Sequence, residues 1–130
     1  YKPYLIEGIY DSLTGECIQK TEPTINETIK LNYDYVFDYI EDGMIGASLN
    51  MPYSYSLSDF GFDVAIKTGT PQTRNLQSQN SLFIGYAPAD DPVLAFAGII
   101  EDGEYSKYMI RDIILAYDEC YGIERPSDTE

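Results

Sequence analysis

The sequence has 130 residues, which suits one domain large enough to bury a hydrophobic core. Hydrophobic residues make up 44% of the chain and charged residues 23%, which excludes a disordered or fibrous protein. Because 22 acidic residues stand against 8 basic ones, the formal charge is -14 and a nucleic-acid backbone would be repelled. We therefore expect a globular domain with no nucleic-acid partner and a solvated acidic surface.

Metal and cofactor chemistry has little support in the residue types present. Histidine is absent, which excludes histidine-dependent catalytic triads and histidine-ligated metals within this chain. Cys17 and Cys120 lack the CxxC spacing of metal and redox sites. They would pair only if the fold brought the chain ends together, and two separate buried thiols are the favoured alternative. We expect neither a metal nor a cofactor.

The N-terminal part predicts a β-hairpin followed by a helix. Residues 4–10 and 16–19 flank the turn-rich "DSLTG" and have the character of paired strands. Residues 21–32 are expected to be an extended connection, at whose end Asn32 can cap a helix. Gly46 is expected to end that helix. Five apolar side chains recur on one helical face and are expected to enter the core: Tyr33, Val36, Phe37, Ile40 and Met44.

The second half predicts an antiparallel meander of three strands. An irregular loop over 47–62 leads into a strand at "DVAIKT", residues 63–68, and a polar connection follows. The segments "SLFIGYA", 81–87, and "VLAFAGII", 93–100, are two further strands joined by the turn "PADDP". Both are nearly continuous apolar runs, so we expect both faces of the sheet to be covered. The two helices expected in this chain are too few to cover both faces alone.

A C-terminal amphipathic helix over residues 105–122 is expected to pack on this sheet, with Gly122 as its stop. Its apolar face is predicted from these residues: Tyr105, Met109, Ile113, either Ile114 or Leu115, Tyr117 and Cys120. The predicted fold class is therefore α+β, with an antiparallel sheet of at least three strands and a helix packed on it. No apolar run approaches the roughly 18 to 20 residues of a membrane helix, and "YKPYLIEGIY" lacks the order of a signal peptide.

Lys67, Thr68, Gly69 and Thr70 stand at the end of the first strand of the meander. These residue types are common at strand ends, where lysine protects an edge, threonine favours the strand and glycine allows a turn. They also suit an anion site, because the ammonium and the hydroxyl both donate hydrogen bonds to a carboxylate. We expect the four residues to line one groove at the sheet edge, with Gly69 leaving space for a ligand to approach the backbone.

The run "IKTGTPQ", followed by "SLFIGYAPADDPVLAFAGIIEDGE" and a terminal helix, resembles the C-terminal part of the penicillin-binding protein transpeptidase domain, most like the class B enzymes. The upstream "YKPYLI" and the spacing from Val36 to Gly43 and Met44 look like the stretch between the second and third motifs of that family. The resemblance covers nearly the whole chain. It implies a partial serine β-lactamase/transpeptidase-like fold of the α/β sandwich type.

The resemblance also implies a division of the chain. Residues 1–62 would be the region between the second and third family motifs, with the hairpin, the helix and the loop. Residues 63–123 would hold the KTGT strand, the two strands after it and the terminal helix, and 124–130 would be a tail. Together these regions would form one incomplete transpeptidase domain.

Two motifs of the family are missing from the sequence. The family's nucleophile lies in Ser-x-x-Lys, and no serine here has a lysine three residues later. The family's second motif is Ser-x-Asn, whereas Ser48 in "SLN" and Ser78 in "SQN" both come after its expected position. Pro71 stands where alanine is common, and "LNMPYS" replaces the family's usual "GT" after the helix. We therefore expect the reacting serine to lie in a first part of the domain that this chain does not contain.

The implied function is that of a peptidoglycan D,D-transpeptidase, which cross-links stem peptides through an acyl-serine intermediate and binds β-lactams. Carried over by residue, Lys67 and Thr68 would hold the carboxylate of the substrate or drug, and Gly69 would let the strand lie close to the acyl chain. The backbone N–H of Thr70 would be one oxyanion donor, so the resemblance implies a catalytic role for Thr70 and substrate-binding roles for Lys67, Thr68 and Gly69.

The implied partners are peptidoglycan stem peptides, β-lactams and the missing N-terminal part of the domain. The location implied is the extracytoplasmic face of the bacterial cell membrane, through an anchor absent from this chain. The chain alone is predicted to be inactive. Two alternatives remain open: a non-catalytic binding module of the same fold, and a β-lactamase or β-lactam sensor.

Overall fold

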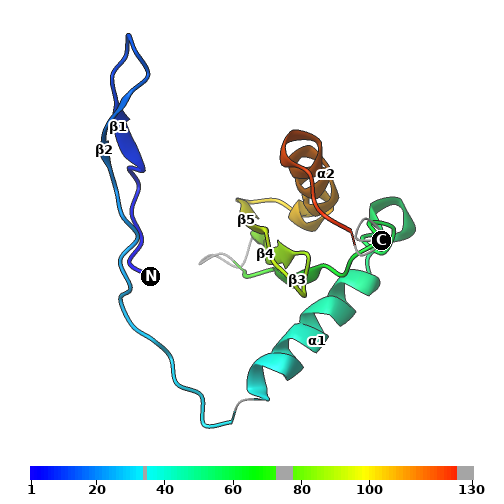
Figure 1. Ribbon diagram of the computed structural model, residues 1–130. Helices are drawn as coiled ribbons and strands as arrows, with labels where there is room; N and C mark the ends of the chain where they lie inside the picture. Colours follow the sequence, from blue (N-terminus) through cyan, green and yellow to red (C-terminus); the bar gives the residue numbers. More distant parts are fainter. Residues whose placement is uncertain (34, 73–77, 126–130) are drawn as a thin grey trace. The chain divides into compact units, whose positions relative to one another are not determined.

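The computed structural model describes residues 1–33, 35–72 and 78–125 (Figure 1). The chain divides into two compact units, Tyr1–Tyr33 and Asp34–Glu130. Each unit has its own antiparallel sheet, one with two strands and the other with three. Within the described residues, no helix combines the length and the apolar character that crossing a membrane requires.

The first unit contains the predicted hairpin, which is confirmed with a shorter first strand and with a second strand that lies one residue later. Strand β1 spans Gly8–Tyr10 and pairs antiparallel with β2, Cys17–Lys20. The carboxylate of Asp11 closes the turn by accepting hydrogen bonds from the backbone N–H groups of Leu13 and Thr14, both at 2.8 Å. Gly15 has a φ of +74°, a conformation that glycine adopts without steric cost.

The second unit is built around the sheet β3-β4-β5, in which every neighbouring pair is antiparallel. Strand β3 spans Ala65–Gly69, β4 spans Ser81–Ala87 and β5 spans Leu94–Ile100. The predicted bounds of β4 are confirmed residue for residue, and those of the other two strands differ by one or two residues. The predicted α+β class, a three-stranded antiparallel sheet with a C-terminal helix, is confirmed.

A helix lies on each face of this sheet, as Figure 1 shows. Helix α2, Met109–Tyr121, buries Ile110 and Ile114 against one face. Helix α1, Val36–Leu49, contacts β3 from the other face. The core lies on the α2 side and consists of these buried residues: Leu57, Phe60, Phe62, Val64, Ile66, Phe83, Ala87, Phe96, Ile110, Ile114 and Ile123.

Two glycine–phenylalanine pairs set the register between β4 and β5. Phe83 lies opposite Gly98, and Gly85 lies opposite Phe96. A Cβ added at either glycine would collide with the ring of its partner. Each ring therefore occupies the space over a glycine, which allows both phenylalanines to enter the core with ring centroids 6.1 Å apart. Any other register would place a side chain where a ring now packs.

Helix α1 begins later and ends later than predicted. The residue before its first turn is Tyr35, which makes no side-chain capping hydrogen bond, so the expected cap at Asn32 is wrong. The helix also continues through Gly46, although glycine disfavours a helix interior. Tertiary packing outweighs this preference, because the added turn brings Ala47 against the core. The side chain of Asn50 then donates to the carbonyl of Gly46 at 2.7 Å and satisfies one terminal acceptor.

The apolar stripe of α1 is not buried as predicted. Phe37 is 58% exposed and Ile40 is 51% exposed. Together with Met44 they line a cavity of about 500 Å³ whose opposite wall is Ile84 and Tyr86 of β4. The hydroxyl of Tyr86 donates to Glu41 at 2.9 Å, and burial together with this carboxylate raises the pKa of Tyr86. The stripe thus faces the sheet but leaves an open apolar groove.

Helix α2 is present, and its predicted apolar face is confirmed in part: Ile114 is buried, and Ile113 and Tyr117 pack against the core. A short 3-10 turn, Ser106–Tyr108, precedes it, and Tyr105 and Met109 are 62% and 49% exposed. The hydroxyls of Ser81 and Ser106 are hydrogen-bonded at 2.7 Å in a buried contact, which fixes where the segment meets the sheet. The helix therefore begins at Met109 and not at Tyr105 as predicted, and its first buried residue is Ile110. The stop at Gly122 is confirmed, with a φ of +76°.

The two cysteines are free, which agrees with the expectation of two separate thiols, but neither is buried as expected. Cys17 lies in β2, where all four residues are exposed. Cys120 lies on α2 outside its buried stripe and is also exposed. Both are free thiols on the surface of their own unit, so the predicted burial is wrong.

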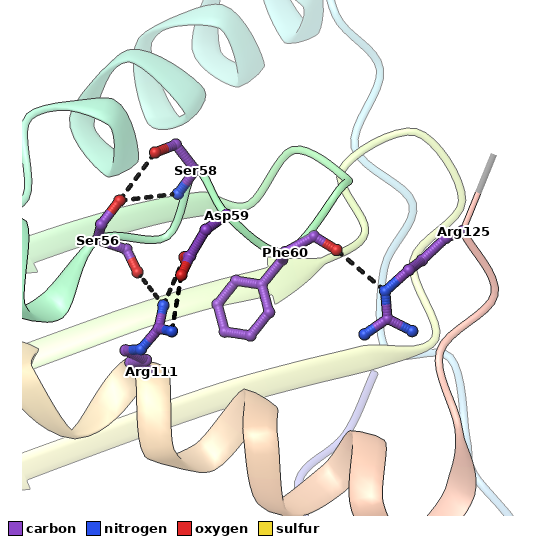
Figure 2. Close-up of polar contacts among 6 residues, drawn as sticks. All are labelled: Ser56, Ser58, Asp59, Phe60, Arg111 and Arg125. Carbon is purple, nitrogen blue, oxygen red and sulfur yellow. Dashed lines mark hydrogen bonds and ion pairs between the residues drawn. The ribbon is translucent and has the colours of Figure 1, made fainter. Parts of the chain in front are cut away.

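Arginine side chains tie α2 to the loop before β3, as Figure 2 shows. Arg111 forms two hydrogen bonds with the carboxylate of Asp59, at 2.6 and 2.8 Å, and also donates to the carbonyl of Ser56. The guanidinium holds the pKa of Asp59 below its ordinary value. Arg125 donates to the carbonyl of Phe60 at 3.1 Å and to the carboxylate of Asp118 at 2.5 Å. These contacts close the α2 side of the core around Phe60.

The packing of the two sheet faces predicts unequal effects of truncation. Phe83→Ala should lower the free energy of unfolding by about 3 to 5 kcal/mol, because it leaves a cavity over Gly98. Ile84→Ala is the matched control on the next residue, whose side chain is 52% exposed, and should cost about 1 kcal/mol or less. Urea unfolding of both variants measures the difference. Equal losses would contradict the assignment of the core to the α2 side.

The ion pair of Asp118 predicts a loss of stability in acid. Arg125, followed by the backbone N–H of Ile123, lowers the pKa of Asp118. In the unfolded chain an aspartate has a pKa of about 3.9, and the pKa of Asp118 in the folded protein is lower. The ion pair therefore stabilises the fold fully above the unfolded pKa, and this contribution is lost as the pH falls through the folded pKa. The melting temperature should therefore fall below about pH 4, and less steeply in Asp118→Asn. Glu119→Gln controls for the change of charge, and parallel curves for wild type and Asp118→Asn would refute the link.

Candidate active site

The residues Lys67 to Thr70 lie at the end of an edge strand. The order β3-β4-β5 leaves β3 with one hydrogen-bonded neighbour in its sheet. Val64, Ile66 and Thr68 are β-branched and favour the extended conformation. Val64 and Ile66 are each 1% exposed, and this burial anchors the strand so that its last residues project from the core.

The two polar side chains of this strand point to opposite faces of the sheet. Thr68 pairs with Phe83, whose ring lies in the core on the α2 side. Lys67 pairs with Ile84, which faces α1 and is 52% exposed. Lys67 is itself exposed, and its Nζ donates to the carbonyl of Thr68 at 2.5 Å. The ammonium therefore lies on the more open face of the sheet, beside the strand edge.

A cavity of about 190 Å³ adjoins the end of β3. Thr68–Thr70 form one wall of this cavity, and Gln79 and Ser81 lie beside that wall. The opposite wall comes from the segment that follows β5. Lys67 does not line the cavity. The predicted single groove thus exists for three of the four residues, and strand alternation is the reason that the fourth lies elsewhere.

Sequence reasoning missed the far wall of this cavity, which consists of Glu104, Tyr105 and Lys107. These residues are brought to β3 by a contact that spans 25 positions of the sequence, the buried hydrogen bond between Ser81 and Ser106. Such a distant pairing has no local signal, because neither serine stands in a recognisable motif. The short "EDGE" turn before the helix was the single local indication that the chain folds back here.

No metal-binding group is found among the described residues: no three side chains of the ligating types Asp, Glu or Cys gather at one point there. The strand edge itself offers the ammonium of Lys67, the hydroxyls of Thr68 and Thr70 and backbone groups. Such groups can bind a carboxylate and stabilise an oxyanion.

The comparison with protein families decides what this strand belongs to. The model of the penicillin-binding protein transpeptidase domain matches residues 1–116, which include β3, β4, β5 and most of α2. The chain belongs to this family. The KTGT residues at the edge of the sheet are therefore part of a penicillin-binding protein transpeptidase domain, and the resemblance inferred from the sequence is confirmed.

Solved structures agree with this assignment. The D,D-transpeptidase domain of a peptidoglycan glycosyltransferase from Eggerthella lenta is 26% identical, with a TM-score of 0.62 over 93% of this chain and 28% of that one. PBP2 of Pseudomonas aeruginosa is 23% identical, with a TM-score of 0.61 over 86% of this chain and 26% of that one. Penicillin-binding protein 2B of Streptococcus pneumoniae strain R6 is 21% identical, with a TM-score of 0.61 over 92% and 22%.

The chain spans between about a fifth and somewhat more than a quarter of the length of these solved structures. The comparison with curated proteins found no match. The findings therefore assign the fold and the transpeptidase domain family, with a part of that domain represented here. The predicted division at residues 62 and 123 stays a prediction.

The close packing around two glycines predicts different tolerance to substitution. At Gly85 an added Cβ would meet the carbonyl oxygen of Ala65 at 2.5 Å and the ring of Phe96, so Gly85→Ala should cost about 1 to 3 kcal/mol. At Gly69 it would meet the tip of Leu82 at 2.8 Å, which can rotate away, so Gly69→Ala should be milder. Thermal unfolding of the two variants tests this. A larger loss at Gly69 would show that Leu82 cannot move.

Proposed function

We propose that this chain supplies the substrate-holding edge of a serine-type D,D-transpeptidase of class B. The enzyme would cross-link peptidoglycan stem peptides through an acyl-serine intermediate and would bind β-lactams at the same place. The observation that carries the proposal is the position of Lys67 to Thr70 at an edge strand within a region that matches the family. An edge strand has free backbone groups with which an extended peptide can pair.

Each of the four residues has a distinct role in this proposal. The carboxylate of the stem peptide or the drug would lie at the strand edge, where the ammonium of Lys67 approaches it from one face of the sheet and the hydroxyl of Thr68 from the other. Charge-assisted hydrogen bonds of this kind are about twice as strong as neutral ones. Gly69 lets the acyl chain lie close to the strand. The backbone N–H of Thr70 donates to the oxyanion that develops when a serine attacks the carbonyl, an interaction typically worth about 2.7 to 4 kcal/mol per donor.

The serine itself would come from outside the sequence described here. No serine of this chain is followed three positions later by lysine, the spacing that activates the nucleophile in the family. The chain alone would therefore bind without turnover. The extracytoplasmic face of the bacterial cell membrane is the proposed location, because that is where peptidoglycan is cross-linked.

Acylation of the full-length protein by a fluorescent penicillin tests the proposal. Lys67→Ala should lower the second-order rate constant of acylation by about 100-fold, because it removes the charged donor to the drug carboxylate. Lys30→Ala, an exposed lysine of the first unit, is the matched control and should acylate at the wild-type rate.

Two results would count against this function. Unchanged acylation in Lys67→Ala would remove the role given to that residue. A full-length protein that is never acylated would favour a non-catalytic binding module, whereas rapid release of the hydrolysed drug would favour a β-lactamase.

A further inference from the structure

The cavity beside the end of β3 carries one negative and one positive side chain on its far wall, Glu104 and Lys107. The other polar groups around it are neutral, and they include the hydroxyls of Thr68 and Ser81 and the amide of Gln79. Its volume of about 190 Å³ lies below the roughly 300 to 1,000 Å³ of pockets that hold a drug-sized ligand. The cavity thus suits a group of about the size of one amino acid.

Neighbouring side chains hold the two charges in place. The amide nitrogen of Gln79 donates to Oε1 of Glu104 at 2.9 Å. The neighbouring carboxylate of Glu104 raises the pKa of the Tyr105 hydroxyl. Lys107 lies with its Nζ 5.3 Å from the centroid of the Tyr108 ring, a favourable distance for a cation over an aromatic face. The carboxylate and the ammonium are therefore ordered on one wall.

The backbone of this wall is held in an unusual conformation. Tyr105 has a φ of +73°, in the left-handed region that bulky residues rarely adopt. Its ring stacks on Tyr108, with centroids 5.6 Å apart, and Tyr108 stacks in turn on Tyr55 at 4.2 Å. The buried hydroxyl of Ser81 also accepts a hydrogen bond from the N–H of Ser106 at 3.0 Å. Several contacts thus maintain a strained residue beside the KTGT edge, as at ligand-binding sites.

We propose that this cavity binds an amino-acid group of the peptide substrate that carries both an ammonium and a carboxylate. Glu104 accepts hydrogen bonds from the ammonium, and Lys107 donates to the carboxylate. The inference rests on the proposed function, since Thr68–Thr70 form the wall shared with the substrate edge. It adds a second recognition point to the carboxylate held by Lys67 and Thr68.

Charge complementarity favours this occupant over simpler ones. A purely anionic group would meet the carboxylate of Glu104, and a purely cationic group would meet the ammonium of Lys107. A neutral sugar would leave both charges without an ionic partner and would displace their hydration. A zwitterion satisfies both side chains at once, and it does so in a protein whose overall charge of -14 disfavours anions in general.

The test uses the full-length protein after acylation by penicillin G, so that the KTGT edge is occupied by the drug. Three small probes are titrated by ligand-observed NMR: D-alanine, D-alaninamide, which lacks the carboxylate, and D-lactate, which lacks the ammonium. D-alanine should bind about three- to fivefold more tightly than either of the others. Lys107→Gln should remove the preference over D-alaninamide, and Glu104→Gln should remove the preference over D-lactate.

Matched controls replace a lysine and an acid that do not line the cavity: Lys30→Gln and Glu101→Gln should keep both preferences. Equal affinities for the three probes, or preferences that survive in Lys107→Gln and Glu104→Gln, would overturn the inference. The acylation step separates this result from the proposed function. If penicillin acylates the protein and no preference is seen, the inference alone fails, whereas a protein that is never acylated loses both.

Discussion

The fit of two phenylalanine rings over two glycines is the constraint on which the second unit depends. Because Phe83 lies over Gly98 and Phe96 lies over Gly85, β4 and β5 can pair in one register only. That register turns Ile66 of β3 and Ile110 of α2 toward the same core. It also decides that Thr68, opposite Phe83, faces the α2 side and that Lys67 does not. The placement of the site residues is thus tied to the packing of the Phe83 ring on the neighbouring strand.

Features with a short-range cause were predictable from the sequence. The bounds of β4 follow from an apolar run between polar turns, and the end of α2 follows from Gly122, whose positive φ suits glycine. The KTGT residues could be chosen as a candidate site because their chemistry lies within four consecutive positions. The hairpin followed from "DSLTG", in which the Asp11 carboxylate closes the turn.

Features set by distant contacts were not predictable. The start of α2 depends on the hydrogen bond between Ser81 and Ser106, and helical spacing alone extends the apolar stripe back to Tyr105, which is exposed. The end of α1 beyond Gly46 depends on the packing of Ala47 against the core. Glu104 and Lys107 reach β3 for the same reason as Ser106 does. Periodicity reports which residues share a face, but it does not report what that face meets.

The ammonium of Lys67 lies on the face of the sheet that the described residues leave largely uncovered. Its cross-strand neighbour Ile84 is 52% exposed, and Ile99 on β5, farther along the same face, is 58% exposed, so this face of the sheet is open around the ammonium. At 4 Å a charge pair is worth about 1 kcal/mol in water and about 4 kcal/mol at the effective dielectric constant near a protein surface. Covering Ile84 and Ile99 would therefore strengthen the attraction of Lys67 for a carboxylate several-fold without moving it. On this argument the binding strength of the KTGT edge depends on the apolar cover of the sheet as much as on the four residues themselves.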